Sequence, residues 1–274
     1  MRTFKKRRLL GVILTSLVAV LFVCGIWSYE IALSNTAFLS GWLLLGLMIF
    51  LASYNVRKKL TYPPLFKSST WMQFHIYVGS FSLLVFFFHT HWRIPTGIFE
   101  SSLYLIFLGL AISGLVGLYF TRMIPSHLAG RGGEVIYERI PKFTKQLREQ
   151  AEELIVKSVE FNDSTILSDY YQANLAPFMA EPRPIGMHLF VFDRVRLKYQ
   201  EELRALHRYL SEEEQVVAKN LSDVLKLKDD LDFHYGNQGL LKFWLFVHIP
   251  LTYSGLLMVL VHVFLIYAFY GGFA

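Results

Sequence analysis

The sequence predicts an all-α integral membrane protein, with a bundle of five transmembrane helices and a mainly helical insert between spans four and five. Five segments are apolar and long enough to cross a bilayer, which takes about 20 helical residues. They lie at roughly 9–30, 37–56, 71–92, 101–121 and 241–270. Hydrophobic residues make up 54% of the chain, as expected for a protein with several spans.

Charge divides the chain in the same way. Residues 1–122 hold the first four spans, 123–240 the insert and 241–274 the fifth span. The net charge of +6 could suggest nucleic-acid binding, but residues 123–240 carry fifteen Lys and Arg against nineteen Asp and Glu, a net charge of −4. The positive surplus flanks the apolar segments instead, as topology determinants do, and no motif indicates nucleic-acid binding.

Basic residues also predict the orientation. The first span follows the basic stretch MRTFKKRR, and its apolar run is longer than that of a signal peptide, so we expect a retained anchor. The loop Arg57–Lys67 is basic too, whereas the opposite side offers only Arg93 among Lys and Arg. This predicts a cytoplasmic N-terminus and insert and an extracytoplasmic C-terminus, in a membrane that we expect to be the bacterial cytoplasmic membrane.

Four histidines share one interval in two distant spans. His75 and His89 are fourteen residues apart in span three, and so are His248 and His262 in span five. Fourteen helical residues rise ~21 Å and complete almost four turns, so each pair lies on one helix face at two depths. Ionisable side chains within a membrane usually mark function. If the two spans run parallel, the four imidazoles can ligate two stacked haems, with His75 and His248 at the inner one and His89 and His262 at the outer one.

Neighbouring residues refine this hypothesis. His91 lies sixteen residues after His75, about 160° from its face on a continuous helix, so we expect His89 to be the ligand. Ser82 and Gly255 each lie seven residues from both histidines of their span, where a small residue would let spans three and five approach between the haems. Arg93 is a candidate partner for the propionates of the outer haem.

The single cysteine, Cys24, cannot form a disulfide within the chain, and no CxxCH motif can attach a c-type haem covalently. Both haems would therefore be b-type, held by iron–histidine ligation and packing alone.

Helical patterns dominate the insert. An apolar stripe predicts a helix over Pro141–Val159, and alternating charge predicts another over Asp193–Leu210. Ser211 and Glu214 form a capping box that starts a helix running to about Leu231, and three prolines make Ala176–Pro184 an expected irregular connector. Four further histidines lack metal-ligand spacing and are expected to be structural: His127, His188, His207 and His234.

In His75, His89, His248 and His262 the chain resembles the di-haem membrane core of ferric reductases and NADPH oxidases, in which two parallel helices each supply two histidines. The cytochrome b of quinol–cytochrome c reductases and the b-type subunits of respiratory dehydrogenases have a similar four-histidine cage. The resemblance covers about the membrane half of the chain. No stretch supplies the flavin and nicotinamide domains of ferric reductases, and the insert has no counterpart in these families.

A chain with two haems and no hydride-accepting cofactor moves single electrons. We therefore expect the electron-transfer subunit of a membrane oxidoreductase complex, working in a respiratory chain between quinol or a donor subunit and an extracytoplasmic acceptor such as a c-type cytochrome. His91, Trp92 and Arg93 are candidates for a quinone site. The alternatives are a transporter or metal permease that uses the histidines as relays, and a scaffold subunit in which they are structural. A transporter would need acidic partners within the spans, but Glu30 and Glu100 lie at span ends.

Overall fold

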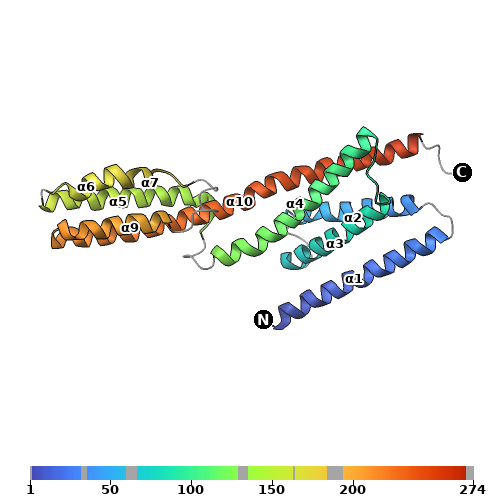
Figure 1. Cartoon of the computed structure of the whole chain (residues 1–274), viewed down its shortest axis with the longest axis horizontal. Helices are drawn as coiled ribbons and strands as arrows, with labels where there is room; N and C mark the ends of the chain where they lie inside the picture. The colour runs from blue at the N-terminus through green and yellow to red at the C-terminus, as the bar shows by residue number, and fades with distance from the viewer. Residues whose placement is uncertain are drawn as a thin grey trace. The chain divides into compact units, whose positions relative to one another are not determined.

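The computed structural model describes residues 2–31, 36–59, 67–128, 135–162, 164–183 and 194–269, and these contain helices and turns but no strand (Figure 1). The long helices are α1 (Arg2–Ile31), α2 (Thr36–Lys59), α3 (Ser68–His89), α4 (Ile98–Leu128), α5 (Ile140–Asn162), α9 (Arg194–Leu206) and α10 (Glu212–Phe269). Short helical pieces are η1 (Tyr137–Arg139), α6 (Ile166–Tyr170), the π-helical turn η2 (Tyr171–Leu175), α7 (Ala176–Ala180) and η3 (His207–Tyr209).

The chain forms two compact units. Unit 1 comprises Met1–Leu118 and Leu245–Ala274, and unit 2 comprises Tyr119–Trp244. The sequence analysis placed the insert at 123–240. Five of the described helices, α1, α2, α3, α4 and α10, are long and apolar enough to cross a membrane, which confirms the predicted number of spans.

Within unit 1, α2 runs antiparallel to both α3 and α10. On α3, Gly41 faces His89 and Leu51 faces Gly79, while on α10 Trp42 contacts Tyr267 and Asn55 donates a hydrogen bond to Tyr253. Two helices that are both antiparallel to a third are parallel to each other. The structure therefore shows α3 and α10 running in the same direction, as the four-histidine hypothesis requires.

The core of unit 1 lies at mid-height, between the two histidine levels. Its buried members come from α2, α3 and α4, and Leu256 and Val259 of α10 pack against them. Phe86 of α3 stacks on Phe107 of α4 with ring centroids 4.1 Å apart. This aromatic contact joins α3 to α4.

Helix α3 ends at His89, three residues before the predicted end of span three. The backbone N–H of Trp92 donates to the carbonyl of Phe87 (3.0 Å) and that of His91 to the carbonyl of Phe88 (3.1 Å). This is a Schellman motif with His91 at the left-handed position, where φ is 49°. Trp92 stacks on Phe87 at 4.8 Å, the apolar contact that often accompanies the motif. The 160° estimate for His91 is therefore wrong, because it assumed a continuous helix.

In unit 2, α5 packs against α6 and α7, and apolar residues from all three join residues of α9 and α10 in one core. The predicted helices at Pro141–Val159 and Asp193–Leu210 correspond to α5 and to α9 with η3. The expectation of an irregular connector is wrong for Ala176–Ala180, which forms α7, because Pro177 sits in the first turn of that helix, where a missing N–H costs nothing.

The capping box is confirmed. The backbone N–H of Glu214 donates to Ser211 Oγ (3.3 Å), and the N–H of Ser211 donates to Glu214 Oε2 (2.9 Å). The predicted end near Leu231 is wrong, because α10 continues unbroken from Glu212 through the fifth span to Phe269. Its residues around Phe233 are buried in unit 2, and this burial outweighs the poor helix propensity of Gly236 and Gly239.

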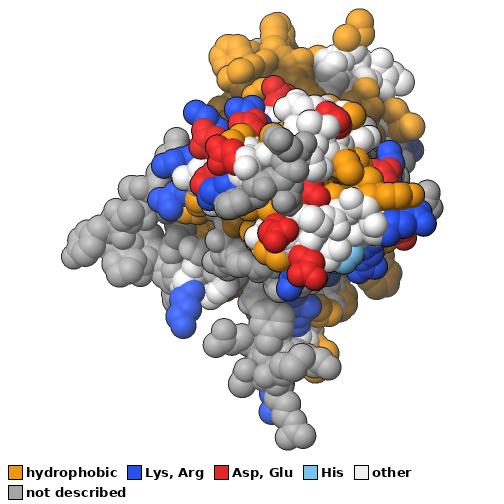
Figure 2. All heavy atoms as spheres, turned by 90° about the vertical axis from the view of Figure 1, so that its left-hand side faces the viewer, with side chains coloured by type: hydrophobic (Ala, Val, Ile, Leu, Met, Phe, Trp, Pro, Cys, Tyr) orange, Lys and Arg blue, Asp and Glu red, His pale blue; other side chains and the backbone are white. Residues whose placement is uncertain are grey.

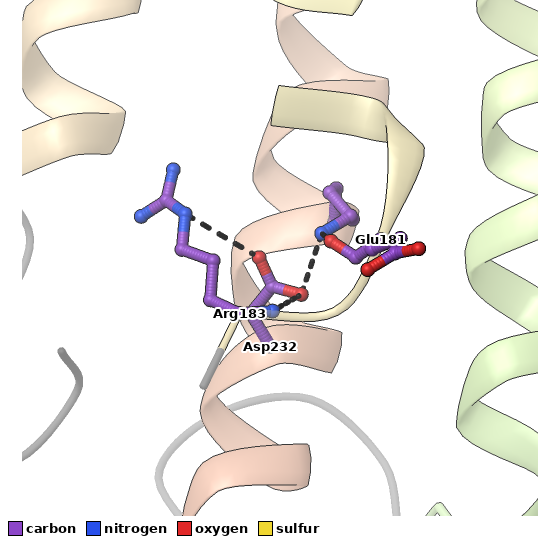
Figure 3. A network of polar contacts seen from close by, with 4 residues as sticks. Glu181, Arg183 and Asp232 are labelled. Atoms are coloured by element: carbon purple, nitrogen blue, oxygen red, sulfur yellow. Dashed lines mark hydrogen bonds and ion pairs between the residues drawn. The ribbon is translucent and has the colours of Figure 1, made fainter. Parts of the chain in front are cut away.

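A buried ion pair within α10 also makes hydrogen bonds to the segment after α7 (Figure 3). Lys228 and Asp232 have no exposed side-chain surface, and Lys228 Nζ donates to Asp232 Oδ1 (2.6 Å) and to the carbonyl of Glu181 (3.0 Å). The backbone N–H of Arg183 also donates to Asp232 Oδ1 (3.4 Å). By contrast, the face of unit 2 shown in Figure 2 carries interspersed acidic and basic side chains, as a solvated surface does.

Candidate functional site

A cavity of about 320 Å³ lies in unit 1 among α2, α3, α4, α10 and the turn that follows α3. Its lining is mostly apolar, with a few polar groups, which is the usual composition of a ligand or cofactor site. The polar and aromatic lining residues include Trp42, His89, Thr90, Arg93, Glu100, Tyr104, His262 and Tyr267. Three residues predicted for the outer site, His89, His262 and Arg93, therefore border one cavity.

The imidazoles of His89 and His262 lie at this cavity with ring centroids 6.4 Å apart and planes at 90°. This separation lies in the ordinary range for a T-shaped contact between two rings. It brings both imidazoles to one cavity, where they would be available as ligands.

Hydrogen bonding fixes the tautomer of His89. Its Nδ1 lies 2.9 Å from the backbone carbonyl of Ala37 and 3.3 Å from Ser40 Oγ. A carbonyl only accepts hydrogen bonds, so Nδ1 carries the proton and Nε2 keeps its lone pair. Metal-bound histidines usually have this arrangement, in which the other ring nitrogen donates to a carbonyl or a carboxylate.

Gly41 makes room for the same imidazole. A Cβ atom at this position would lie 3.0 Å from His89 Cε1 and 3.4 Å from Nδ1, closer than ordinary contact. Helix α2 therefore provides both the hydrogen-bond acceptors and the space that this ring needs.

His262 is held by the α4 side of the cavity. Phe99 stacks on its ring, with centroids 6.3 Å apart and planes 20° apart. Glu100 and Arg93 line the cavity near the start of α4, and Arg93 is exposed. An exposed cation at the edge of the cavity could meet an acidic group of a ligand, such as a propionate.

The inner histidines contact different helices. His248 Nδ1 lies 3.0 Å from Ser113 Oγ of α4, and a Cβ at Gly114 would lie 4.0 Å from His248 Cε1. The ring of His75 packs on Tyr54 of α2, with centroids 5.2 Å apart. The joint ligation of an inner haem by His75 and His248 stays a prediction.

The two midpoint residues lie in the bundle interior. Ser82 is buried, and its hydroxyl donates to the carbonyl of Gly79 within α3 (2.8 Å). A Cβ at Gly255 would lie 3.3 Å from Ile106 of α4 and 3.9 Å from Met48 of α2. Gly255 therefore allows close approach to α4 and α2, rather than to α3 as the sequence analysis assumed.

The remaining histidines do not form a metal cluster in the part of the chain that the structure describes. His127 and His207 are exposed, whereas His234 is buried in unit 2. His188 lies outside the described residues. Among those described, no group of three or more His, Cys, Asp or Glu side chains could hold a metal ion.

Sequence reasoning missed Ser40 and Gly41 in α2 and Ser113 and Gly114 in α4. A Ser–Gly pair inside an apolar span was the available signal. It is not specific, because Ser254–Gly255 has the same sequence and its glycine faces α4 and α2. Only the helix packing shows which pairs meet an imidazole.

Comparisons with protein-family models, with characterised proteins and with solved structures gave no significant match to this chain. The site's own geometry therefore carries the functional argument.

Proposed function

We propose that this protein carries electrons across a membrane through two b-type haems, each ligated by two histidines. The observation that carries the proposal is the arrangement at the outer cavity. There His89 and His262 border one cavity with ring centroids 6.4 Å apart, and the hydrogen bond from His89 Nδ1 to the Ala37 carbonyl leaves Nε2 available for iron.

The residues of the cavity fit a haem in chemistry as well. Aromatic and aliphatic side chains would exclude water from the macrocycle, and Arg93 would neutralise propionate charge. A haem bound there supplies a one-electron couple whose potential depends on its axial ligands and their hydrogen bonds. By the fourteen-residue interval, His75 and His248 would hold the second haem ~21 Å away along the helices, which suits transfer across the hydrocarbon core.

In this proposal the two haems move single electrons and accept no hydride, so the chain needs partners that donate and accept electrons. Electrons would enter from quinol or from a donor subunit and leave to an extracytoplasmic acceptor such as a c-type cytochrome. The basic residues near the span ends favour a cytoplasmic location for both the N-terminus and unit 2.

A reduced-minus-oxidised absorption spectrum of the purified chain tests the proposal. We expect a b-type signature with about two haems per polypeptide, since four histidines provide two axial pairs. A folded preparation that stays colourless after incubation with haem would refute it. Uptake of a substrate or metal ion by vesicles that contain this preparation would favour the transporter.

Histidine variants test the pairing. His89→Ala and His262→Ala should each remove or shift the same redox component, because both ligands serve one iron. The double variant should be little worse than either single one, since coupled changes are not additive. His248→Ala should affect the other component. If His89→Ala and His248→Ala removed the same component, the assignment of pairs would fail.

A further inference from the structure

Two helices without a predicted ligand, α2 and α4, each place a serine followed by a glycine against a ligand imidazole. In α2 the pair is Ser40 and Gly41, which contact His89. In α4 it is Ser113 and Gly114, which contact His248. Each serine is within hydrogen-bond distance of Nδ1, and each glycine lies beside Cε1 of the same ring.

We propose that these two Ser–Gly pairs are positioning elements that set the reduction potential of each haem separately, α2 acting on the outer haem and α4 on the inner one. The inference rests on the proposed function, because it concerns ligands of the same two haems. It assigns a role to α2 and α4, which in the four-histidine scheme contribute no ligand.

In α2, the His89 imidazole contacts both Ser40 and a closer hydrogen-bond acceptor, the carbonyl of Ala37. Ser40 donates its own proton to the carbonyl of Thr36 (2.8 Å), so its oxygen lone pair faces His89 Nδ1 at 3.3 Å. The carbonyl of Ala37 is closer, at 2.9 Å. Loss of the Ser40 hydroxyl would leave this shorter hydrogen bond in place, so the outer haem should depend on Ser40 only weakly.

The α4 pair makes the shorter serine contact. Ser113 Oγ lies 3.0 Å from His248 Nδ1, against 3.3 Å for Ser40 and His89. When the imidazole donates its Nδ1 proton, Nε2 becomes more basic and stabilises ferric iron, which lowers the reduction potential. Removing the Ser113 acceptor should therefore raise the potential of the inner haem.

The test is a redox titration of the full-length protein with Ser113→Ala, Ser113→Thr and Ser40→Ala. Ser102→Ala is the matched control, because Ser102 is a half-buried serine of α4 whose hydroxyl donates to the carbonyl of Ile98 (2.8 Å). The inner component is the one that His248→Ala removes or shifts.

In Ser113→Ala we expect the stabilisation of ferric over ferrous iron in the inner component to fall about tenfold. This corresponds to a rise of ~59 mV in the midpoint potential of a one-electron couple, and the midpoint potential of the outer component should not change. Ser113→Thr should restore the wild-type value, Ser40→Ala should shift only the outer component and by less, and Ser102→Ala should shift neither. If Ser113→Ala loses the inner haem instead, its retention in Ser113→Thr supports the same role.

Unchanged midpoint potentials in Ser113→Ala, or equal shifts in the potentials of both components, would overturn the inference. The proposed function would stay intact, since the wild-type protein would still show two b-type haems. Loss of the inner haem in Ser113→Thr as well would contradict a role for the hydroxyl. A wild-type chain without haem would overturn both.

Discussion

Replacement of Gly41 by alanine tests most directly whether α2 shapes the outer site. The new Cβ would lie 3.0 Å from His89 Cε1. Carbon atoms make favourable contact at about 3.5–4.0 Å, so the imidazole would have to move by roughly 0.5 Å. Catalytic and metal sites tolerate displacements only up to about 0.5 Å, which places this change at the limit.

Adding a methyl group to a packed interior typically costs about 1–3 kcal/mol. If that cost is borne by the haem-bound state, the affinity for the outer haem falls roughly 5- to 150-fold, because each 1.4 kcal/mol is tenfold. The inner haem should stay, because His248 contacts α4 through Ser113 and Gly114.

The assay is the number of haems per chain after purification, combined with the rate at which haem passes to an apoprotein acceptor. Gly46→Ala is a control in the same helix, because a Cβ at Gly46 would meet nothing within 4 Å. Gly41→Ala and Gly46→Ala gain about the same helix propensity. Wild-type haem content and release rate in Gly41→Ala would refute the assigned role of this glycine.

Three further changes probe the bundle, the end of α3 and unit 2. Gly255→Leu should destabilise unit 1 by about 1–3 kcal/mol, since even a Cβ at Gly255 would lie 3.3 Å from Ile106; an unchanged melting temperature would contradict this packing. His91→Gly should stabilise the turn by roughly 1 kcal/mol and keep both haems, since it removes a non-glycine residue from φ 49°; loss of a redox component would make His91 a ligand. Lys228→Met should destabilise unit 2 by about 3–5 kcal/mol, since it leaves Asp232 buried without its ammonium partner. Burial raises the pKa of the Asp232 carboxyl, and Lys228 and Arg183 oppose that rise. The variant keeps only the longer contact with the Arg183 guanidinium (3.8 Å), so it should lose more stability at pH 8 than at pH 5. Hydrogen exchange of residues 219–235 at the two pH values measures this, and an equal loss at both would show that Asp232 stays neutral.

The spans and most insert helices could be predicted because each has a strong local signal. Apolar length identifies a span, and the Ser211–Glu214 capping box fixes the start of α10 within one residue. These signals depend on the chain near each element, and the packing of the whole molecule changes them little.

The ends of two helices could not be predicted from the sequence pattern. At the end of α3 the left-handed position of the Schellman motif holds His91 instead of the usual glycine, so the sequence gives no stop signal there. In α10 the two glycines Gly236 and Gly239 suggest a break, but burial of neighbouring Asn237, which donates to the carbonyl of Phe233 (2.9 Å), keeps the helix continuous.

For the site, periodicity predicts which side chains share a helix face but not which other helix supplies their hydrogen-bond partners. The fourteen-residue interval selects His89 and His262 without knowledge of the fold, because both are ionisable groups inside apolar spans. Ser40 and Ser113 carry no such mark, since a serine in a membrane helix commonly bonds its own backbone, as Ser80 does with the carbonyl of Ile76 (3.0 Å).

The arrangement of the helices suggests a division of roles in the proposed electron path. Helices α3 and α10 run parallel and present the histidines at equal intervals, which sets where the two haems would lie. Helices α2 and α4 contact one ligand histidine at each level, His89 and His248, through hydrogen bonds of different length. In the proposed function, hydrogen bonds to axial ligands would tune the potential of each haem, so substitutions in α2 should change the potential of the outer haem and substitutions in α4 that of the inner one.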